Sequence, residues 1–385
     1  MARRTDASPD RRLRHVCGCI RSTPGDFAPL LALEFCGAPG SLPAARRFRG
    51  ADIEALLVGY GGSNPGASVL VMQHGTVLLR HSCGLACCST GVSVQGDTNF
   101  RLASVTKQFT AVAILLLRND GALRLSDTLC DIFPDFPTYG RDVDVRHLLQ
   151  HTSGLRDYFN LLAVGRTEQV SDAEVLQMMR DQSGTNFAPG SAYEYSNTGY
   201  CVLAEIIAAV SGQSYSSFLR DRIFRPLGMV HTVAHQEGTS HVARRAFGHS
   251  RENSTDRWQR DDQSLTSATL GDGGVYTSID DLVAWEKVWL SGASAALSLP
   301  SSTTVEILTS GALNNGETIG YGYGWRIGRG VGGRTTHSHT GSTRGFRNIY
   351  LRYPQEELSI VVLTNRNEGE PEQIASKIAA AILGQ

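Results

Sequence analysis

Lysine is the least used charged residue of this chain. Of the 36 basic residues among 385, only Lys107, Lys287 and Lys377 are lysines, which leaves 33 arginines. Lysine and arginine are not interchangeable, because only lysine readily loses its proton when it is buried. Lys107 stands just before the apolar run from Ala111 to Leu117, so its position calls for a chemical explanation.

Long apolar runs and an excess of charge are also lacking. The run from Ala111 to Leu117 ends at Arg118, far short of the about 18 residues that a membrane span needs. The 36 basic and 37 acidic residues give a net charge of −1, which creates no general field for attracting nucleic acid. The sequence therefore predicts a soluble protein with no membrane span and no nucleic-acid partner, and it favours a small substrate.

Cysteine is present without the spacing of a disulfide framework or a metal site. The eight cysteines are an even number, but a chain of this size does not need disulfides to fold. We expect free thiols. The group Cys83, Cys87 and Cys88 could in principle bind a soft metal, yet no Cys-x-x-Cys pair accompanies it. We therefore expect no metal and no cofactor.

Residues 1–50 differ from the remainder of the chain. They are rich in arginine, proline and glycine and show no sustained periodicity, which predicts a poorly ordered leader. An apolar patch from Phe27 to Phe35 follows several arginines, as in a secretory signal, but Pro29 and Glu34 interrupt it and no clean cleavage site follows. We expect a cytoplasmic protein; a periplasmic or secreted one is the alternative if the leader is a signal.

The pattern becomes regular from residue 51. Segments Ala67–Gln73 and Thr76–His81 are β-rich and are joined by His74-Gly75, which predicts a hairpin. Helical patterns follow at Val145–Gln150, Ala173–Arg180 after a capping Ser171, Tyr200–Val210 and Ser214–Arg222. Strand patterns return at Tyr321–Gly328, Phe346–Pro354 and Leu358–Arg366, before a closing helix at about Pro371–Leu383.

This order predicts an α/β (α+β) fold. Strands at both chain ends and helices between them favour one antiparallel sheet flanked by helices, with a mainly helical lobe inserted. We assign the sheet region to residues 51–125 and 315–385, and the lobe to residues 126–314. A cleft forms naturally at the junction of two such regions.

Ser104 and Lys107 suggest a chemical use for that cleft. Residues three apart on a helix share a face, so the two side chains can touch at the start of the helix that contains the apolar run. Serine attacks only when a base removes its proton, and a lysine among apolar side chains loses pKa and becomes a usable base. The free N–H groups of the helix start could stabilise an oxyanion. The alternative is an ordinary solvent-facing lysine beside an N-capping serine.

Two further motifs follow in the chain: Tyr195-Ser196-Asn197 within YEYSNTGY, and His339-Thr340-Gly341 within THSHTGSTRGF. With Ser104-x-x-Lys107 before them, the chain resembles the serine β-lactamase and penicillin-binding protein superfamily, especially its branch of class C β-lactamases, DD-peptidases and esterases. The resemblance continues through LLQHTSGLRDY, FRPLGMVHT, LGDGGVYTSIDDLVAW and YGYGW. It spans roughly residues 51 to 383.

The resemblance implies a role for each motif residue. Ser104 would be the acylated nucleophile, and Lys107 its proton acceptor or the group that keeps the neighbouring base in its reactive state. Tyr195 would pass a proton to the leaving group. The substrate and its oxyanion would contact Asn197, His339, Thr340, Gly341, Ser342 and Arg344. The backbone N–H groups of Ser104 and Ser342 would form the oxyanion hole. Taken singly, Tyr195 could be a packed aromatic, Asn197 a helix N-cap and His339 a core histidine.

His339 is the informative departure from the family pattern. Many members of the superfamily carry lysine there, and that cation helps to hold a substrate carboxylate. A histidine is mostly neutral at pH 7, so carboxylate capture would be weaker unless Arg344 or Arg347 contributes. The resemblance therefore implies an acyl-enzyme hydrolase for esters or D-amino-acid amides and peptides, with β-lactam hydrolysis as an alternative. Fold and motif leave the substrate and the oligomeric state open.

We give two glycine-containing segments structural interpretations. We interpret His151–Gly154 as a turn, and Gly271–Asp281 as a close-packed turn whose Ser278 and Asp281 form a capping box.

A catalytically silent module that binds penicillin or cell-wall peptide is the competing function. Such a module would be expected to lose Ser104, Lys107 or Tyr195, and the chain has all three.

Overall fold

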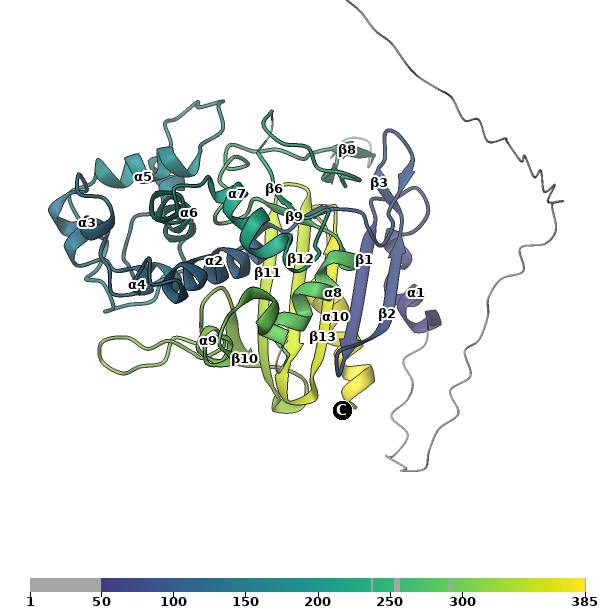
Figure 1. The fold of residues 1–385 in the computed structure, drawn as a ribbon. Helices are drawn as coiled ribbons and strands as arrows, with labels where there is room; N and C mark the ends of the chain where they lie inside the picture. The colour runs from purple at the N-terminus through teal and green to yellow at the C-terminus, as the bar shows by residue number, and fades with distance from the viewer. Residues whose placement is uncertain (1–49, 237, 253–256, 291–292, 385) are drawn as a thin grey trace, which may run out of the picture. The chain divides into compact units, whose positions relative to one another are not determined.

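Strands from both ends of the chain form one six-stranded antiparallel sheet, in the order β10-β11-β12-β13-β1-β2 (Figure 1). The structure is a computed structural model that describes residues 50–384 except 237, 253–256 and 291–292. The strands are β1 (Ala67–Gln73), β2 (Thr76–Cys83), β10 (Arg326–Arg329), β11 (Thr335–Thr343), β12 (Phe346–Tyr353) and β13 (Leu358–Thr364). The predicted fold class is confirmed. The leader predicted for residues 1–50 lies outside the described residues, apart from Gly50.

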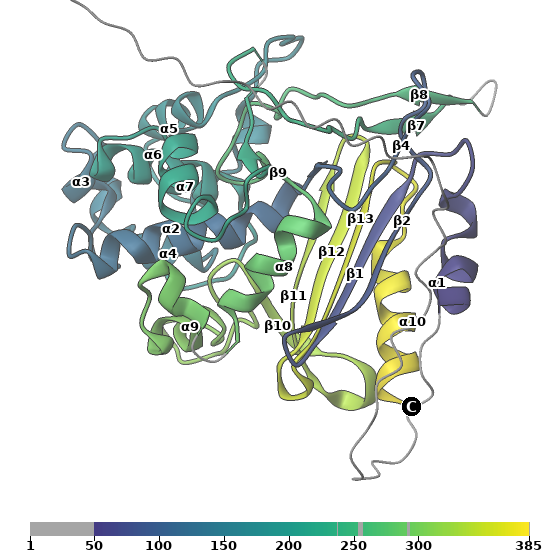
Figure 2. The ribbon, with the colours of Figure 1, turned by 45° about the vertical axis from the view of Figure 1, so that its right-hand side comes forward.

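Helices lie over both faces of this sheet (Figure 2), and a cluster of buried hydrophobic side chains fills each side. Along β1, Val69 and Val71 pack on the side of helices α1 (Gly50–Leu56) and α10 (Pro371–Leu383). Their neighbours Leu70 and Met72 belong to the core on the opposite side, where helix α8 (Ile279–Val288) lies. Alternate residues of a strand point to opposite faces, which explains why β1 is apolar at nearly every position.

The β1–β2 hairpin was predictable from its turn. His74 and Gly75 have φ values of 48° and 73°, and two positive φ values are the signature of a type I′ turn. Strand pairing begins beside the turn with Gln73 opposite Thr76, as the sequence predicted. Strand β2 continues to Cys83, two residues beyond the predicted end.

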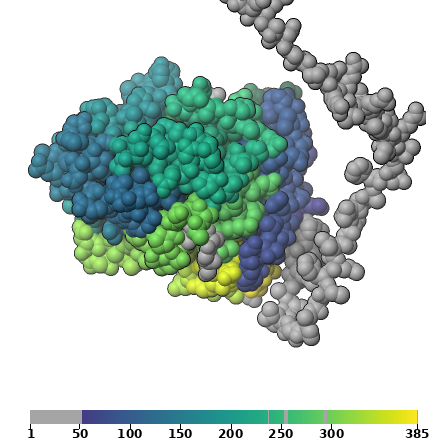
Figure 3. Space-filling model, viewed as in Figure 1, coloured from purple at the N-terminus to yellow at the C-terminus, as the bar shows by residue number. Residues whose placement is uncertain are grey.

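The helices between the two parts of the sheet are mostly short. They are α2 (Lys107–Asn119), α3 (Leu129–Ile132), α4 (Val145–Leu149), α5 (Asp172–Arg180), α6 (Asn197–Ser211), α7 (Tyr215–Leu219), α8 and α9 (Ser301–Ile307). Helix α8 comes from the range assigned to the helical lobe but packs on β1 and β13 of the sheet. Seen from the side of Figure 3, teal and green segments cover most of the yellow C-terminal strands.

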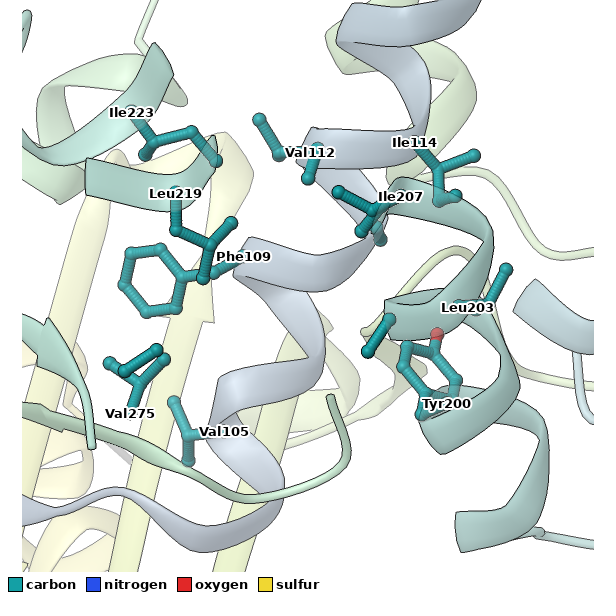
Figure 4. Close-up of a cluster of buried hydrophobic side chains, with 14 of the residues drawn as sticks. Val105, Phe109, Val112, Ile114, Tyr200, Leu203, Ile207, Leu219, Ile223 and Val275 are labelled. Atoms are coloured by element: carbon teal, nitrogen blue, oxygen red, sulfur yellow. The ribbon is translucent and has the colours of Figure 1, made fainter. Parts of the chain in front are cut away.

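Helix α2 is the centre of the larger hydrophobic core (Figure 4). Every residue from Lys107 to Leu117 is buried, so the helix has no solvent-facing side over this stretch. Phe109 stacks on Trp285 with ring centroids 4.1 Å apart, while Tyr200 and Leu203 bring helix α6 against it. A polar group at the start of this helix is therefore held by packed neighbours on all sides.

Two local predictions need correction. Residues Tyr321–Trp325, predicted as part of a strand, lie outside strand β10, which begins at Arg326. Gly324 has a φ of 75°, a left-handed conformation that a strand does not allow. Ser278 caps α8 by accepting from the N–H of Asp281, but the Asp281 carboxylate accepts from the Thr232 hydroxyl and the His231 N–H instead of closing a capping box.

Three short β-structures complete the fold: β3 (Leu85–Cys87) with β4 (Val92–Ser93), β5 (Phe100–Arg101) with β9 (Val275–Thr277) and β6 (Val233–Ala234), and β7 (His249–Arg251) with β8 (Trp258–Arg260). Strand β5 leads directly into the segment that carries Ser104. Within the described part of the chain, no helix combines the length and apolar character that crossing a bilayer requires.

Candidate active site

Ser104 lies on a 3-10 turn (Ala103–Thr106) that leads into helix α2, one turn earlier than the α-helix itself. A 3-10 turn has three residues per turn, so residues i and i+3 are stacked and Lys107 lies directly over Ser104. The chain enters this turn through Ala103, whose φ of 51° is unusual for a residue other than glycine. Such conformations persist where the surroundings enforce them, and they cluster at functional sites.

Lys107 is fully buried and its amino group contacts three oxygen atoms. Its Nζ atom lies 3.2 Å from Ser104 Oγ, 2.8 Å from Asn197 Oδ1 and 3.0 Å from the backbone oxygen of Asp272. The oxygens of Asn197 and Asp272 can only accept hydrogen bonds, so they take two N–H groups of Lys107. The remaining tetrahedral position of Nζ faces Ser104 Oγ.

Aromatic rings enclose the amino group of Lys107. Its Nζ atom lies 5.0 Å from the ring centroid of Tyr195 and 5.3 Å from that of Tyr200. The imidazole of His151 lies against Tyr195, with ring centroids 4.4 Å apart. Its Nδ1 atom accepts from the N–H of Ser196, which places the ring proton on Nε2, and this atom has no partner among the described residues. Burial, aided by the positive charge of Lys107, lowers the pKa of His151 well below its ordinary value.

The ring of His339 lies 6.0 Å from that of Tyr195, and neither residue is among those that line the catalytic pocket. It is 1% exposed, and both of its ring nitrogens are engaged. Nδ1 donates to the Thr340 carbonyl oxygen at 2.7 Å, so Nε2 accepts from the Tyr321 hydroxyl at 2.9 Å. Burial, together with the charge of Lys107, lowers the pKa of His339 to about 3. A buried neutral imidazole with these partners offers no cation to a substrate carboxylate.

A cavity of about 670 Å³ opens over Ser104. Its lining includes Asn197 and, from the end of strand β11 and the turn after it, Ser342, Thr343 and Arg344. Thr340 and Gly341 line a neighbouring cavity of about 490 Å³, which shares Ser342 with the first. Strand β11 packs directly on the Ser104 segment, since a Cβ atom on Gly341 would lie 2.0 Å from the Leu102 carbonyl oxygen. Only glycine allows this close approach.

Neither arginine considered from the sequence is a free cation at the cavity. Arg344 pairs with Asp261, with 3.4 Å between Nη1 and Oδ1. Arg347 donates through Nη1 to the backbone oxygens of Thr343 and Phe346. Both side chains border the catalytic pocket, and the Nη1 atom of each is engaged, that of Arg344 with the loop after β8 and that of Arg347 with the turn between β11 and β12.

Sequence reasoning missed the acidic groups beneath Lys107. Asp172, Cys201 and Asp272 are buried, and their potential ligand atoms lie within 4.8 Å of one another. It is the one such trio among the described residues. Burial, reinforced by the charge of Asp272, raises the pKa of Asp172 well above its ordinary value. Both carboxylate oxygens of Asp172 accept from backbone N–H groups, whereas the Oδ1 atom of Asp272 has no partner among the described residues.

A serine whose Oγ atom touches a buried lysine at the floor of an open pocket is typical of a serine hydrolase that works by acyl transfer. Comparison with known proteins identifies the group. The family model described as Beta-lactamase matches residues 53–385. The chain belongs to this family, and it is a serine hydrolase of the β-lactamase-related type.

Individual relatives agree with this assignment. Penicillin-binding protein 4* of Bacillus subtilis (strain 168) is 31% identical over 329 residues, covering 82% of this chain and 72% of that protein. The D-aminopeptidase of Gluconobacter oxydans (strain 621H) is 30% identical over 350 residues, covering 87% of this chain but only 61% of the relative. An octameric penicillin-binding protein homologue from Pyrococcus abyssi superposes with a TM-score of 0.71 at 25% identity, covering 87% of this chain and 76% of that one.

Proposed function

We propose that this enzyme hydrolyses amide bonds of D-amino-acid amides or short D-peptides through an acyl-enzyme on Ser104. The observation that carries the proposal is the position of Lys107 Nζ, 3.2 Å from Ser104 Oγ and bonded otherwise to two pure acceptors. A neutral amine with two N–H groups committed in this way directs its lone pair at the serine hydroxyl. That orientation is what a base for Ser104 requires.

The first step forms the bond between Ser104 Oγ and the substrate carbonyl carbon. As Oγ attacks, its proton moves to Lys107 Nζ, and the carbonyl oxygen becomes an oxyanion. We assign the oxyanion site to the backbone N–H groups of Ser104 and Ser342, which border the same cavity. Tyr195, over whose ring Nζ lies at 5.0 Å from the centroid, is the group proposed to pass the proton on to the leaving nitrogen. The C–N bond then breaks and an amine leaves.

Hydrolysis repeats these proton transfers with water in place of the amine. Water attacks the acyl carbon, its proton leaves through the Tyr195–Lys107 pair, and Ser104 regains a proton as the acid is released. Asn197 fixes the Lys107 amino group throughout, because its Oδ1 atom accepts from Nζ at 2.8 Å. No cofactor is needed to balance these steps.

The surroundings of His339 support an amide or aminopeptidase substrate over one with a free carboxylate beside the scissile bond. His339 is buried and neutral, and the Nη1 atoms of Arg344 and Arg347 are engaged with protein partners. The name D-aminopeptidase, carried by a relative 30% identical to this chain, supports the same choice. β-Lactams and acyl-D-alanyl-D-alanine, which carry such a carboxylate, are therefore expected to be poorer substrates.

Two measurements test this proposal. Intact-mass analysis after treatment with a fluorophosphonate should show one adduct that maps to Ser104, and Ser104→Ala should show none. A panel of D-alanine p-nitroanilide, its L enantiomer, N-acetyl-D-alanyl-D-alanine, p-nitrophenyl acetate and nitrocefin should give the highest kcat/KM for the D-anilide among the amides. Absence of the adduct would refute the acyl-enzyme, and faster turnover of nitrocefin would replace the proposed substrate with a β-lactam.

A further inference from the structure

Lys107 is oriented partly by the loop of residues 267–274, which lies outside the Ser104-x-x-Lys107 and Tyr195-Ser196-Asn197 motifs. The backbone oxygen of Asp272 accepts from Lys107 Nζ at 3.0 Å, so the position of residues 267–274 determines one of the three contacts of the amino group. The loop is close-packed, because a Cβ atom on Gly271 would lie 2.2 Å from the Tyr200 carbonyl oxygen. Whatever holds the loop also sets the direction of Nζ.

Asp172, the first residue of helix α5, is hydrogen-bonded to the backbone of this loop. Its two carboxylate oxygens accept from the backbone N–H groups of Leu270 at 2.8 Å and Gly271 at 3.4 Å. These are the two residues directly before Asp272. Asp172 is 5% exposed and does not line the catalytic pocket, so it can influence the reaction only through the loop. Its two hydrogen-bond partners are 98 and 99 residues away along the chain.

The loop is also fixed from other sides. Thr110 of helix α2 donates its hydroxyl to the Gly271 carbonyl oxygen at 2.7 Å. Arg101 donates to Ser267 Oγ at 2.7 Å and, through Nε, to the Gly273 carbonyl oxygen at 3.3 Å. The Asp172 carboxylate is therefore one of three anchors, and it is the only one of these three that accepts from the loop's N–H groups.

We propose that Asp172 is a positioning residue that acts on Lys107 through the backbone of Leu270, Gly271 and Asp272. This inference rests on the proposed function of Lys107. A buried carboxylate is an expensive way to fasten a loop, since burial disfavours its charged form. Its two oxygens accept from two adjacent N–H groups at once and so fix the peptide that presents the Asp272 oxygen to Nζ.

Substitutions at Asp172 should lower turnover more than affinity. Asp172→Asn keeps one acceptor oxygen but places an amide NH₂ where the second one was; Asp172→Ala removes both. With p-nitrophenyl acetate, we expect kcat to fall about 10-fold for Asp172→Asn and about 100-fold for Asp172→Ala, since displacements on the order of 1 Å have effects of that size. KM should stay within about threefold, because the residue does not touch the pocket.

Asp281 provides the matched control. It is also a buried acid in the first turn of a helix, 7% exposed, and it also accepts from a distant backbone N–H, that of His231. It does not line the catalytic pocket. Asp281→Ala should lower the melting temperature as Asp172→Ala does, but leave kcat within about twofold. Equal kcat losses in the two variants would overturn the proposal.

A second route covers the case in which Asp172→Ala does not fold. Thr110→Val keeps the side-chain shape and removes the bonds to the Gly271 oxygen and to the Tyr215 hydroxyl, and it should lower kcat in the same direction as Asp172→Asn. Unchanged kcat in both folded variants would refute the positioning role alone. If wild-type protein formed no fluorophosphonate adduct at Ser104, the proposed function would fall and this inference with it, so the two failures are distinguishable.

Discussion

Two of the buried charged clusters in the described part of the chain are built in opposite ways. Glu286 of helix α8 and Arg352 of strand β12 form an ion pair whose side chains are 3% and 4% exposed. Arg352 Nε donates to both carboxylate oxygens at 3.0 and 3.1 Å, and the Tyr350 hydroxyl donates to Oε2 at 2.7 Å. The charge on each side is met by an opposite charge, and the cluster joins α8 to the sheet.

The cluster around Lys107 is compensated less completely. The three oxygen partners of its amino group are uncharged, and nearby polar atoms lack partners among the described residues, namely His151 Nε2 and Asp272 Oδ1. One of the three partners, Ser104, opens to a cavity. Equal burial therefore has different consequences: full pairing produces a structural tie, while incomplete pairing beside a pocket leaves a group able to exchange a proton.

The largest expected effect comes from exchanging the amine of Lys107 for a guanidinium. Lys107→Arg keeps a basic side chain, but guanidinium stays protonated at working pH and is bulkier than an amino group. Loss of the proton acceptor should slow acylation of Ser104 by about 10²- to 10⁴-fold. Single-turnover labelling with a fluorophosphonate measures this rate. Labelling as fast as in the wild type would mean that Lys107 belongs with the structural cluster.

The structural cluster should respond in stability instead. Glu286→Ala leaves Arg352 buried without its counter-ion, which typically costs about 3 to 5 kcal/mol of unfolding free energy. Urea unfolding followed by fluorescence measures the loss, and the folded fraction should acylate at the wild-type rate.

The paired replacement Glu286→Leu with Arg352→Met sharpens this test. Removing both charges together should recover most of the lost stability, because apolar side chains replace a buried ion pair at little cost. Stability that stays as low as in Glu286→Ala would show that the charges do more than compensate each other. A change in acylation rate would mean that the two clusters are coupled.

His339 provides an intermediate effect, which depends on pH. Its pKa is about 3 in the folded protein, below the ordinary value of 6.5, because of burial and the charge of Lys107. The unfolded chain therefore takes up this proton first, and the contribution to stability is complete above pH 6.5 and is lost as the pH falls toward 3. Between pH 7 and pH 5 the loss should be about 2 kcal/mol.

Comparison with His339→Gln isolates this contribution from that of the carboxylates. Glutamine does not titrate, so the difference in unfolding free energy between the two proteins should shift by about 2 kcal/mol in favour of the variant when the pH is lowered from 7 to 5. Parallel pH dependence of the two proteins would show that His339 takes up its proton without unfolding.

The sequence predicted features that depend on neighbouring residues. The His74-Gly75 turn could be predicted because both residues tolerate positive φ, and the contact of Ser104 with Lys107 because residues three apart are stacked. The sheet followed from strand patterns at both chain ends, which pair across nearly 300 residues, as in Val69 opposite Val362. Tyr195 was singled out as a candidate site residue by the motif resemblance.

The support beneath the site could not be predicted in this way. Asp172 reaches Leu270 across 98 residues and His151 reaches Ser196 across 45, and no local pattern indicates either contact. The conformation of Tyr321–Trp325 was mistaken for a strand because aromatic and glycine residues alternate there, whereas Gly324 turns the chain against the Lys107 backbone. Side chains that act through tertiary contacts carry no periodicity of their own.

The smallest expected effect concerns the other two lysines, whose substitutions serve as controls for Lys107→Arg. Lys287 on α8 and Lys377 on α10 are exposed, so a guanidinium at either position meets water instead of a packed wall. Lys287→Arg and Lys377→Arg should change the unfolding free energy by less than about 0.5 kcal/mol and leave fluorophosphonate labelling unchanged. Lys287 is the stricter control, since it directly follows Glu286 and would reveal any coupling between the ion pair and the helix surface. If its substitution slowed acylation as much as Lys107→Arg did, the effect at Lys107 would reflect the substitution of lysine in general and not the loss of a base beside Ser104.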